Sequence, residues 1–202
     1  MSKFIVLDGL DGAGKSTQAK MLHKALEQDG IKTILTREPG GTKVANLIRE
    51  ILINEKMDEL TEYLLFSASR RDHIVNLINP ALKRGETVIC DRFIDSSWAY
   101  QPNINFNTRK NVDVDVSDTE DNYINPDIVF ILDISPELAM ERLNSRGNKN
   151  EFDKRSLDFF RNARTEYLDR VLYQTHYFLI DASRSEEIIH QEILDIVRNW
   201  VY

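Results

Sequence analysis

The 202-residue chain contains a single cysteine, Cys90, so no disulfide can form within one copy of it. This fits a reducing compartment. The sequence also lacks an apolar run long enough to span a bilayer. Its first apolar stretch is interrupted at once by Asp8, unlike a secretory signal. We therefore expect a soluble cytoplasmic protein with no membrane partner.

An excess of positive charge is missing as well. The chain has 26 Lys and Arg against 33 Asp and Glu, a formal net charge of -7, which argues against a general nucleic-acid-binding surface. An anionic ligand must therefore be held by a local cluster of Arg and Lys. The sequence has no repeats or low-complexity tracts, and its length suits one domain with a real core. We expect a single domain over residues 1–202.

The sequence does contain short apolar runs that alternate with helical patterns. This alternation is typical of a parallel sheet covered by helices on both faces. We predict a three-layer α/β fold with a five-stranded parallel sheet, whose strands cover residues 4–7, 32–36, 87–90, 127–133 and 177–180. The predicted helices cover residues 17–26, 44–53, 58–83, 94–100, 135–145, 156–174 and 185–201. Pro80 is expected to kink the longest helix near its end.

Two stretches lack this regularity. Residues 102–125 are polar and contain several Asn and Asp, so we expect a mobile loop with at most a short helix. Residues 146–155 are charged and lie between two predicted helices, a placement that suits a lid, over about 142–155, that closes on a bound ligand.

Residues 9–16 match the pattern G-x-x-x-x-G-K-S/T between the first predicted strand and the first predicted helix. Glycines let several backbone N–H groups surround phosphate oxygens, and the helix adds its positive N-terminal end. Lys15 can reach the outer phosphates and the Ser16 hydroxyl can bind Mg²⁺. A chance glycine turn is the other interpretation, and the flanking strand and helix disfavour it. The predicted nucleotide-binding residues are Gly9, Leu10, Asp11, Gly12, Ala13, Gly14, Lys15, Ser16 and Thr17.

Three charged pairs follow predicted strands, at the sheet edge where ligands of such folds bind: Asp8-Gly9, Arg37-Glu38 and Asp91-Arg92. Arginines suit an acceptor phosphate because a guanidinium makes bidentate contacts. The other interpretation of Arg37 and Arg92 is a surface salt bridge. Asp91 can hold a Mg²⁺-bound water near the phosphates or cap a helix, and the two roles are compatible.

Several segments together resemble the thymidylate kinase family, in the order and near the spacing of that family. They are residues 4–17, 37–42, 65–70, 91–93, 96–101 and 126–127. The similarity covers nearly the whole chain except residues 102–125. It implies a fold like that of P-loop nucleoside monophosphate kinases. It also implies transfer of the γ-phosphoryl group of ATP to dTMP with Mg²⁺, in the route to dTTP.

The resemblance also assigns an acceptor site. In the family, residues matching Arg37 and Arg92 hold the dTMP phosphate, and one matching Asp11 lies near the sugar 3′-hydroxyl. Residues matching Phe66 and Arg70 stack on the thymine ring and hydrogen-bond its edge. From the residues alone, Asp11 can also be a turn residue and Phe66 a core residue. The polar face of the helix at 94–100 adds groups that can read the base or simply pack: Ser96, Ser97, Tyr100 and Gln101. A tyrosine there would crowd out a 2′-hydroxyl.

The lid contains the basic residues Arg142, Arg146, Lys149, Lys154 and Arg155. In the bacterial type of the family the phosphate loop lacks an extra arginine and the lid supplies the catalytic one. Ala13 marks this chain as that type, so Arg142 and Arg146 are the candidate lid arginines, and the other basic residues can be a solvated charge run. The predicted catalytic residues are Lys15, Asp91, Arg92, Arg142 and Arg146, with Ser16 and, through water, Asp91 at the metal.

Two other functions remain open from the sequence. The first is another small-molecule kinase, acting on a different nucleoside monophosphate or on a deoxynucleoside. The second is a nucleotide-dependent switch, which the absence of a guanine-reading Asn-Lys-x-Asp run disfavours. The family is commonly dimeric through helices, and the helix at 58–83 is rich in apolar residues, so we expect a homodimer.

Overall fold

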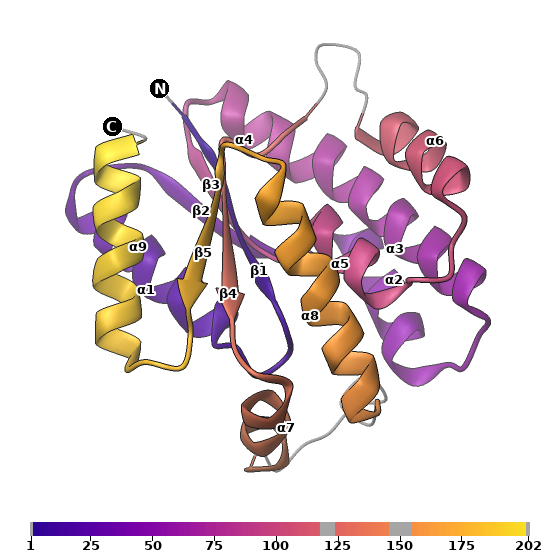
Figure 1. Ribbon diagram of the computed structural model, residues 1–202. Coiled ribbons are helices and arrows are strands. Elements are labelled where there is room, and N and C mark those ends of the chain that lie inside the picture. Colours follow the sequence, from indigo (N-terminus) through magenta and orange to yellow (C-terminus); the bar gives the residue numbers. More distant parts are fainter. Residues whose placement is uncertain (1, 118–123, 146–154, 201–202) are drawn as a thin grey trace.

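The computed structural model describes residues 2–117, 124–145 and 155–200. Its five strands pair in parallel in the order β2-β3-β1-β4-β5 (Figure 1). The strands are β1 (Phe4–Gly9), β2 (Thr33–Arg37), β3 (Thr87–Asp91), β4 (Ile128–Asp133) and β5 (Tyr177–Asp181). The predicted α/β fold with a five-stranded parallel sheet is confirmed.

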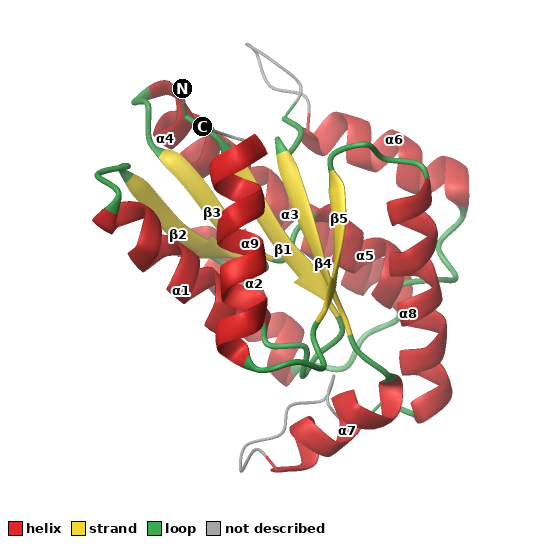
Figure 2. Ribbon diagram, turned by 60° about the vertical axis from the view of Figure 1, so that its left-hand side comes forward, coloured by secondary structure: helices red, strands yellow, loops and turns green. Residues whose placement is uncertain are grey.

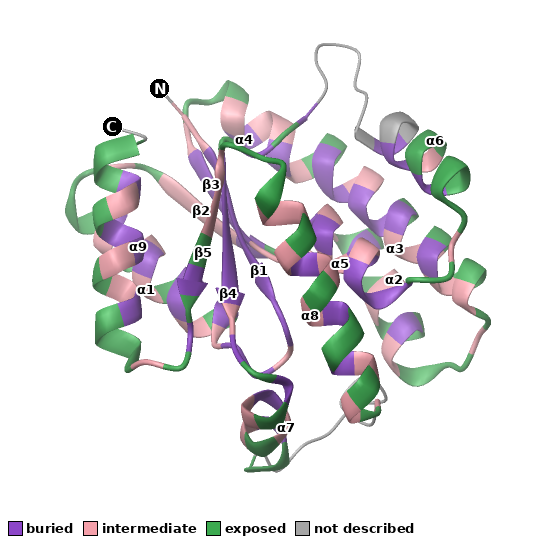
Figure 3. Cartoon of the chain, viewed as in Figure 1, coloured by how far each residue is buried: buried purple, intermediate pink, exposed green. Residues whose placement is uncertain are grey.

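The three central strands β3, β1 and β4 are almost entirely buried (Figure 3). They are nearly continuous runs of Val, Ile, Leu and Phe because helices cover both faces of the sheet. The polar residues Asp8 and Asp91 interrupt these runs only at their carboxyl ends. Every strand ends at the same edge of a parallel sheet, so the polar groups that follow the strands gather there.

Helices α1 (Lys15–Gln28) and α9 (Glu186–Trp200) cover one face of the sheet (Figure 2). The opposite face carries α3 (Glu59–His73), α5 (Ile94–Tyr100) and α8 (Leu157–Leu172). Helices α2 (Lys43–Asn54) and α6 (Phe106–Ser117) pack on α3. Helix α7 (Pro136–Ser145) follows β4 at the carboxyl edge of the sheet.

The helix predicted over residues 58–83 is present, with one irregular turn. Helix α3 continues into a π-helical turn, η1 (Ile74–Ile78), and then into α4 (Asn79–Lys83). Pro80 lies in the first turn of α4. A proline ring displaces the carbonyl four residues earlier, and the wider π turn directly before it accommodates that displacement.

The expectation of at most a short helix at residues 102–125 is wrong. The segment contains the twelve-residue helix α6. Two charged residues lie on its buried side, Arg109 at 3% exposure and Asp113 at 5%. A search for apolar periodicity misses such a helix because part of its inward face is polar.

Within the ranges given above, no helix is long and apolar enough to cross a membrane. The central part of the predicted lid, residues 146–154, lies outside the described residues.

Candidate active site

The glycine loop joins β1 to α1 at the carboxyl edge of the sheet. Gly9 has a φ of 134°, and a Cβ there would lie 2.4 Å from the carbonyl oxygen of Leu132 on the neighbouring strand. Gly14, with a φ of 91°, is the residue before α1. Both positions need glycine because a side chain would strain the backbone. The loop therefore delivers the N-terminus of α1 to the sheet edge, where a phosphate can accept its N–H groups.

Lys15 lies folded against this loop. Its Nζ donates to the carbonyl oxygen of Leu10 at 2.7 Å, and the side chain is buried. Burial and the nearby Arg92 charge together lower the pKa of Lys15 to about 8, against the carboxylates of Asp11 and Asp91, which raise it. An anionic ligand in the loop would provide the negative charge that favours the ammonium form.

Ser16 and Asp91 meet beside the loop, where they form a candidate metal site. The Ser16 hydroxyl donates to Asp91 Oδ2, while Asp91 Oδ1 is buried and has no hydrogen-bond partner in the described part of the chain. A hydroxyl, a carboxylate and nucleotide phosphates are the oxygen ligands that suit Mg²⁺, which keeps several waters. The residues therefore fit the metal expected from the sequence.

A pocket opens next to the loop, between α2, α3 and α5. It is lined by Asp11, Glu38, Pro39, Arg49, Leu52, Ile53, Phe66, Arg92, Ser96, Ser97, Tyr100 and Gln101. Seven of the nine predicted acceptor residues are among them. Asp11 belongs to both the loop and the pocket, so a triphosphate in the loop and a ligand in the pocket would be neighbours.

Arg92 is at the centre of the pocket. Its Nη2 donates to Asp11 Oδ1 at 2.6 Å, and its guanidinium lies 5.1 Å from the centre of the Tyr100 ring. Burial would raise the pKa of Asp11, but the Arg92 and Lys15 charges and a hydrogen bond from Tyr100 outweigh it and lower this pKa to about 2. Arg92 also has a φ of 75°, an uncommon backbone conformation that is typical of functional sites.

Behind Arg92, the fully buried Asp8 fixes the start of α5. Its Oδ1 accepts from Ser96 Oγ at 2.7 Å and from the Tyr167 hydroxyl at 2.8 Å. Its Oδ2 accepts from the backbone N–H groups of Phe93 at 3.2 Å and Ser96 at 3.1 Å. Ser96 is therefore held by Asp8 and by Arg92 Nη1, which donates to its hydroxyl at 2.7 Å.

Arg70 lies behind the pocket wall. Its Nε donates to Glu38 Oε2 at 2.8 Å and its Nη2 donates to Ser97 Oγ at 2.8 Å. Its Nη1 is buried without a hydrogen-bond partner within the described ranges, and lies 3.9 Å from Asp113 Oδ1. Phe66, one helical turn earlier on α3, lines the pocket itself.

Arg37 and Arg49 divide the predicted phosphate site between them. Arg37 is exposed and lines a neighbouring cleft with Ser16 and Asp91, whereas Arg49 lines the pocket that contains Arg92. Burial lowers the pKa of Arg49, and the like charges of Arg37 and Arg92 lower it further. Three guanidinium groups therefore act on one region, which favours binding of a multiply charged anion.

The chain is similar to known kinases over nearly its whole length. A family model described as thymidylate kinase matches residues 7–193. The thymidylate kinase of Methylobacillus flagellatus is 37% identical over 203 residues, 98% of each chain. That of Rickettsia typhi is 47% identical over 161 residues, 79% of this chain and 78% of the relative. The chain belongs to the thymidylate kinase family.

This membership confirms the family that the motifs predicted. Relatives over nearly the full length also include the thymidylate kinase of Halothermothrix orenii, 39% identical over 204 residues and 96% of each chain. The matched stretches therefore extend across the segment at 102–125.

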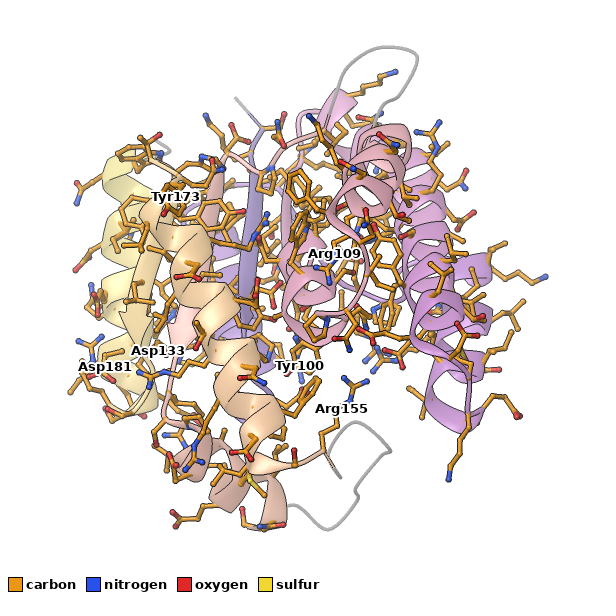
Figure 4. The ribbon with its side chains drawn as sticks, turned by 45° about the vertical axis from the view of Figure 1, so that its right-hand side comes forward. Tyr100, Arg109, Asp133, Arg155, Tyr173 and Asp181 are labelled. Carbon is orange, nitrogen blue, oxygen red and sulfur yellow. The ribbon has the colours of Figure 1, made fainter. Side chains whose placement is uncertain are left out.

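The two described arginines of the predicted lid lie in two different places. Arg142 on α7 donates to the carbonyl oxygens of Ala182 at 3.0 Å and of Gly12 in the glycine loop at 3.4 Å. Arg155 donates instead to the carbonyl oxygen of Tyr100 at 3.0 Å and to Glu62 (Figure 4). Interpreting Arg155 as part of a solvated charge run was wrong. Arg146, Lys149 and Lys154 lie outside the described residues.

Sequence reasoning missed Arg49, Glu62 and the structural role of Glu38. Arg49 is the only arginine in the predicted helix at 44–53, which is otherwise rich in apolar residues. A single arginine in such a helix could have pointed to a site residue. The sequence places Glu38 only in a charged pair that follows a strand, whereas in the structure it accepts from Arg70 and pairs with His73. Glu62 gave no signal because it is one of many acidic residues on helices.

Proposed function

We propose that the chain transfers the γ-phosphoryl group of ATP to the phosphate of dTMP, giving ADP and dTDP on the route to dTTP. The observation that carries this proposal is the sharing of Asp11 between the glycine loop and the pocket. That sharing puts a donor triphosphate next to an acceptor phosphate held by Arg92. Membership of the thymidylate kinase family favours this reaction over a different small-molecule kinase or a nucleotide switch.

On the donor side, the loop residues 9–17 bind the phosphates of ATP through backbone N–H groups and Lys15. Ser16 and, through a water, Asp91 would hold Mg²⁺, which when bound would supply positive charge next to the phosphates. Little covalent chemistry is required of the protein in phosphoryl transfer, so positioning and charge stabilisation carry the catalysis.

On the acceptor side, Arg92 and Arg49 hold the dTMP phosphate from inside the pocket, and Arg37 adds positive charge from the cleft beside it. The Arg92 guanidinium is fixed by Asp11 and Ser96 before any ligand arrives. Such preorganisation avoids the cost of ordering the side chain during the reaction. Asp11 lies near the sugar of dTMP. The Tyr100 hydroxyl donates a hydrogen bond to Asp11 Oδ2 at 2.9 Å, and the Tyr100 side chain occupies the space that a 2′-hydroxyl of the sugar would need.

The base is read by Phe66, which stacks on it, and by two polar groups. Gln101 Oε1 and Arg70 Nη1 are buried and lack hydrogen-bond partners in the described part of the chain. One is an acceptor and the other a donor, and a thymine offers a donor at N3 and an acceptor at O4. Leaving the buried Gln101 oxygen unpaired is costly, whereas Arg70 Nη1 already has the Asp113 carboxylate 3.9 Å away. A base with a donor at N3 is therefore favoured. Ser97 supports Arg70 in this role.

Arg142 and Arg146 are the proposed arginines that stabilise the migrating phosphoryl group. Arg142 lies against the glycine loop at Gly12, and Arg146 belongs to the proposed lid at about 142–155, part of a single domain over residues 1–202.

A coupled assay of ADP formation tests the function with dTMP, dCMP, dGMP, thymidine and no acceptor. We expect dTMP to be the preferred acceptor and ATP turnover without an acceptor to be slow. Equal rates with dTMP and dCMP, or a preference for thymidine, would point to the other kinase classes. ATP hydrolysis that no monophosphate changes would support a nucleotide switch.

A homodimer is the proposed assembly. Helix α2 exposes Val44, Leu47 and Ile51 on one side, and α3 exposes Leu60 and Leu64. Such an apolar face on α2 and α3 suits a twofold interface, in which the same two helices of a second copy pack against it. We expect a dimer in sedimentation analysis and a monomer for Leu47→Glu with Ile51→Glu. A monomeric wild-type chain at micromolar concentration would exclude it. The cytoplasmic location stays a prediction.

A further inference from the structure

Glu62 joins the acceptor pocket to the far end of the lid. Its Oε1 accepts a hydrogen bond from Gln101 Nε2 at 2.6 Å. Arg155 Nη2 donates to Oε1 at 3.2 Å and to Oε2 at 3.4 Å. Gln101 is 1% exposed and lines the pocket. One carboxylate on α3 therefore holds a pocket residue from α5 and a residue that follows the lid.

This contact determines which way the Gln101 amide points. A carboxylate paired with a guanidinium only accepts hydrogen bonds, so the amide must turn its NH₂ group toward Glu62. The amide oxygen then faces away from Glu62, and it is the atom left without a partner in the described part of the chain. Without Glu62 the amide could rotate by half a turn and present nitrogen in the same place.

Arg155 in turn fixes Glu62. Its Nη1 donates to the carbonyl oxygen of Tyr100 at 3.0 Å, and its guanidinium lies 4.3 Å from the centre of the Phe159 ring. Figure 4 shows Arg155 beside Tyr100. The pair is partly buried, with 22% of the Arg155 side chain and 17% of the Glu62 side chain exposed. Screening by water is therefore reduced for this pair.

The orientation of Gln101 decides which pyrimidine edge the pocket accepts. A 4-oxo pyrimidine has an N3–H donor for the amide oxygen of Gln101. A 4-amino pyrimidine has an acceptor at N3, so its N3 and the amide oxygen would face each other as two acceptors. A flipped Gln101 would offer N–H to N3 of the 4-amino ring and remove this mismatch.

We propose that Glu62 is a specificity-determining positioning residue: it holds Gln101 in the orientation that accepts a 4-oxo pyrimidine and rejects a 4-amino one. The inference rests on the proposed function and adds to it the source of base discrimination. Glu62 acts through Gln101 and does not touch the reacting atoms.

The test compares dTMP with 5-methyl-dCMP, which has the same methyl group, sugar and phosphate and differs only at the N3 and C4 edge. In Glu62→Gln the side chain can both donate and accept, so Gln101 is free to take either orientation. We expect the ratio of kcat/KM for dTMP to that for 5-methyl-dCMP to fall about tenfold or more. The change should arise mainly in KM, with kcat for dTMP within about threefold of wild type.

Two matched controls separate this role from general destabilisation. Glu62→Asp keeps an acceptor-only group and should retain the wild-type ratio even where overall activity falls. Glu59→Gln changes a half-buried acid one turn earlier on α3. Glu59 accepts a hydrogen bond from the Asn103 side chain at 2.7 Å and does not line the pocket. This variant should leave the ratio and both rates unchanged.

Parallel losses for both nucleotides in Glu62→Gln, or an unchanged ratio, would overturn the proposal and leave Glu62 a structural residue. If Glu62→Gln fails to fold, Glu62→Leu removes the same constraint and gives the same ratio test. If 5-methyl-dCMP is not turned over, calorimetric dissociation constants replace the rates. Failure of the proposed function would look different, because the wild-type chain itself would not prefer dTMP.

Discussion

Arg92 Nη2 and Asp11 Oδ1 lie 2.6 Å apart, joining the residue after β3 to the glycine loop. Only 16% of the Arg92 side chain and 27% of the Asp11 side chain are exposed. The pair thus connects the proposed ATP-binding loop to the proposed dTMP pocket through a largely desolvated contact. Substitution of either residue should show whether dTMP turnover and ATP binding depend on it separately.

Arg92→Ala should lower kcat/KM for dTMP by about a hundredfold or more, because it removes a preorganised positive charge from the acceptor phosphate. Affinity for ATP, measured by calorimetry, should change by less than about threefold. Arg92→Lys keeps a positive charge beside Asp8 and Asp11, so this variant should stay folded. Its kcat/KM for dTMP should still fall, because lysine lacks the guanidinium fork. Arg161→Ala, at an exposed pair with Glu137, is the neutral control. Equal loss of ATP binding and dTMP turnover would show that Arg92 is not an acceptor residue.

Asp11 should make the stability of the chain depend on acid pH. Its pKa is lowered from 3.8 to about 2 in the folded chain, so the unfolded chain binds the proton more tightly. The resulting stabilisation, on the order of 2 kcal/mol, is fully present above about pH 5 and is lost as the pH falls toward 2.

Urea unfolding of wild type and Asp11→Asn between pH 7 and pH 3 measures this contribution. The difference in unfolding free energy should be constant down to about pH 5 and fall to roughly half by pH 3. A difference that grows on acidification would contradict the assigned direction of the shift.

Lys15 should make ATP binding weaken in alkaline solution. Its pKa is lowered to about 8, so the free enzyme loses this positive charge as the pH rises through that value. The dissociation constant for ATP, followed from pH 6.5 to 9.5, should begin to rise near pH 8, by up to about tenfold per unit. In Lys15→Arg the guanidinium does not titrate in this range, so the rise should disappear. A rise that persists in Lys15→Arg belongs to another group.

Asp113 should be critical for the packing of α6. Its Oδ1 accepts from the Tyr63 hydroxyl and its Oδ2 accepts from Trp98 Nε1, each at 3.0 Å, and Arg70 Nη1 is 3.9 Å away. Asp113→Ala removes the shorter of the two hydrogen bonds of the buried Tyr63 hydroxyl and the acceptor of the half-buried Trp98 Nε1, so it should cost about 1–3 kcal/mol of unfolding free energy. Lys110→Ala, on the exposed side of α6, should change stability by less than about 0.5 kcal/mol. A similar effect of the two variants in chemical denaturation would mean that α6 is not anchored through Asp113.

The strands, most of the helices and the glycine loop were predictable because each depends on a contiguous pattern. A buried run such as Ile5-Val6-Leu7 indicates a strand by itself, and the glycines of the loop are required by the local backbone. Helix α6 was not predictable in this way, because Arg109 and Asp113 on its buried side are hydrogen-bonded to residues on other elements, among them Trp98 and Tyr63.

The sequence by itself determined the fold class, the family and a site built from residues after strand ends, since parallel strands bring their carboxyl ends to one edge. Only the tertiary structure decided that Arg49 and not Arg37 lines the acceptor pocket, and that Glu62 orients Gln101. Those assignments depend on how α2 and α3 pack beside the sheet. The packing of two helices decides which of their side chains reach the space between them. No local pattern of residues along one helix encodes this packing.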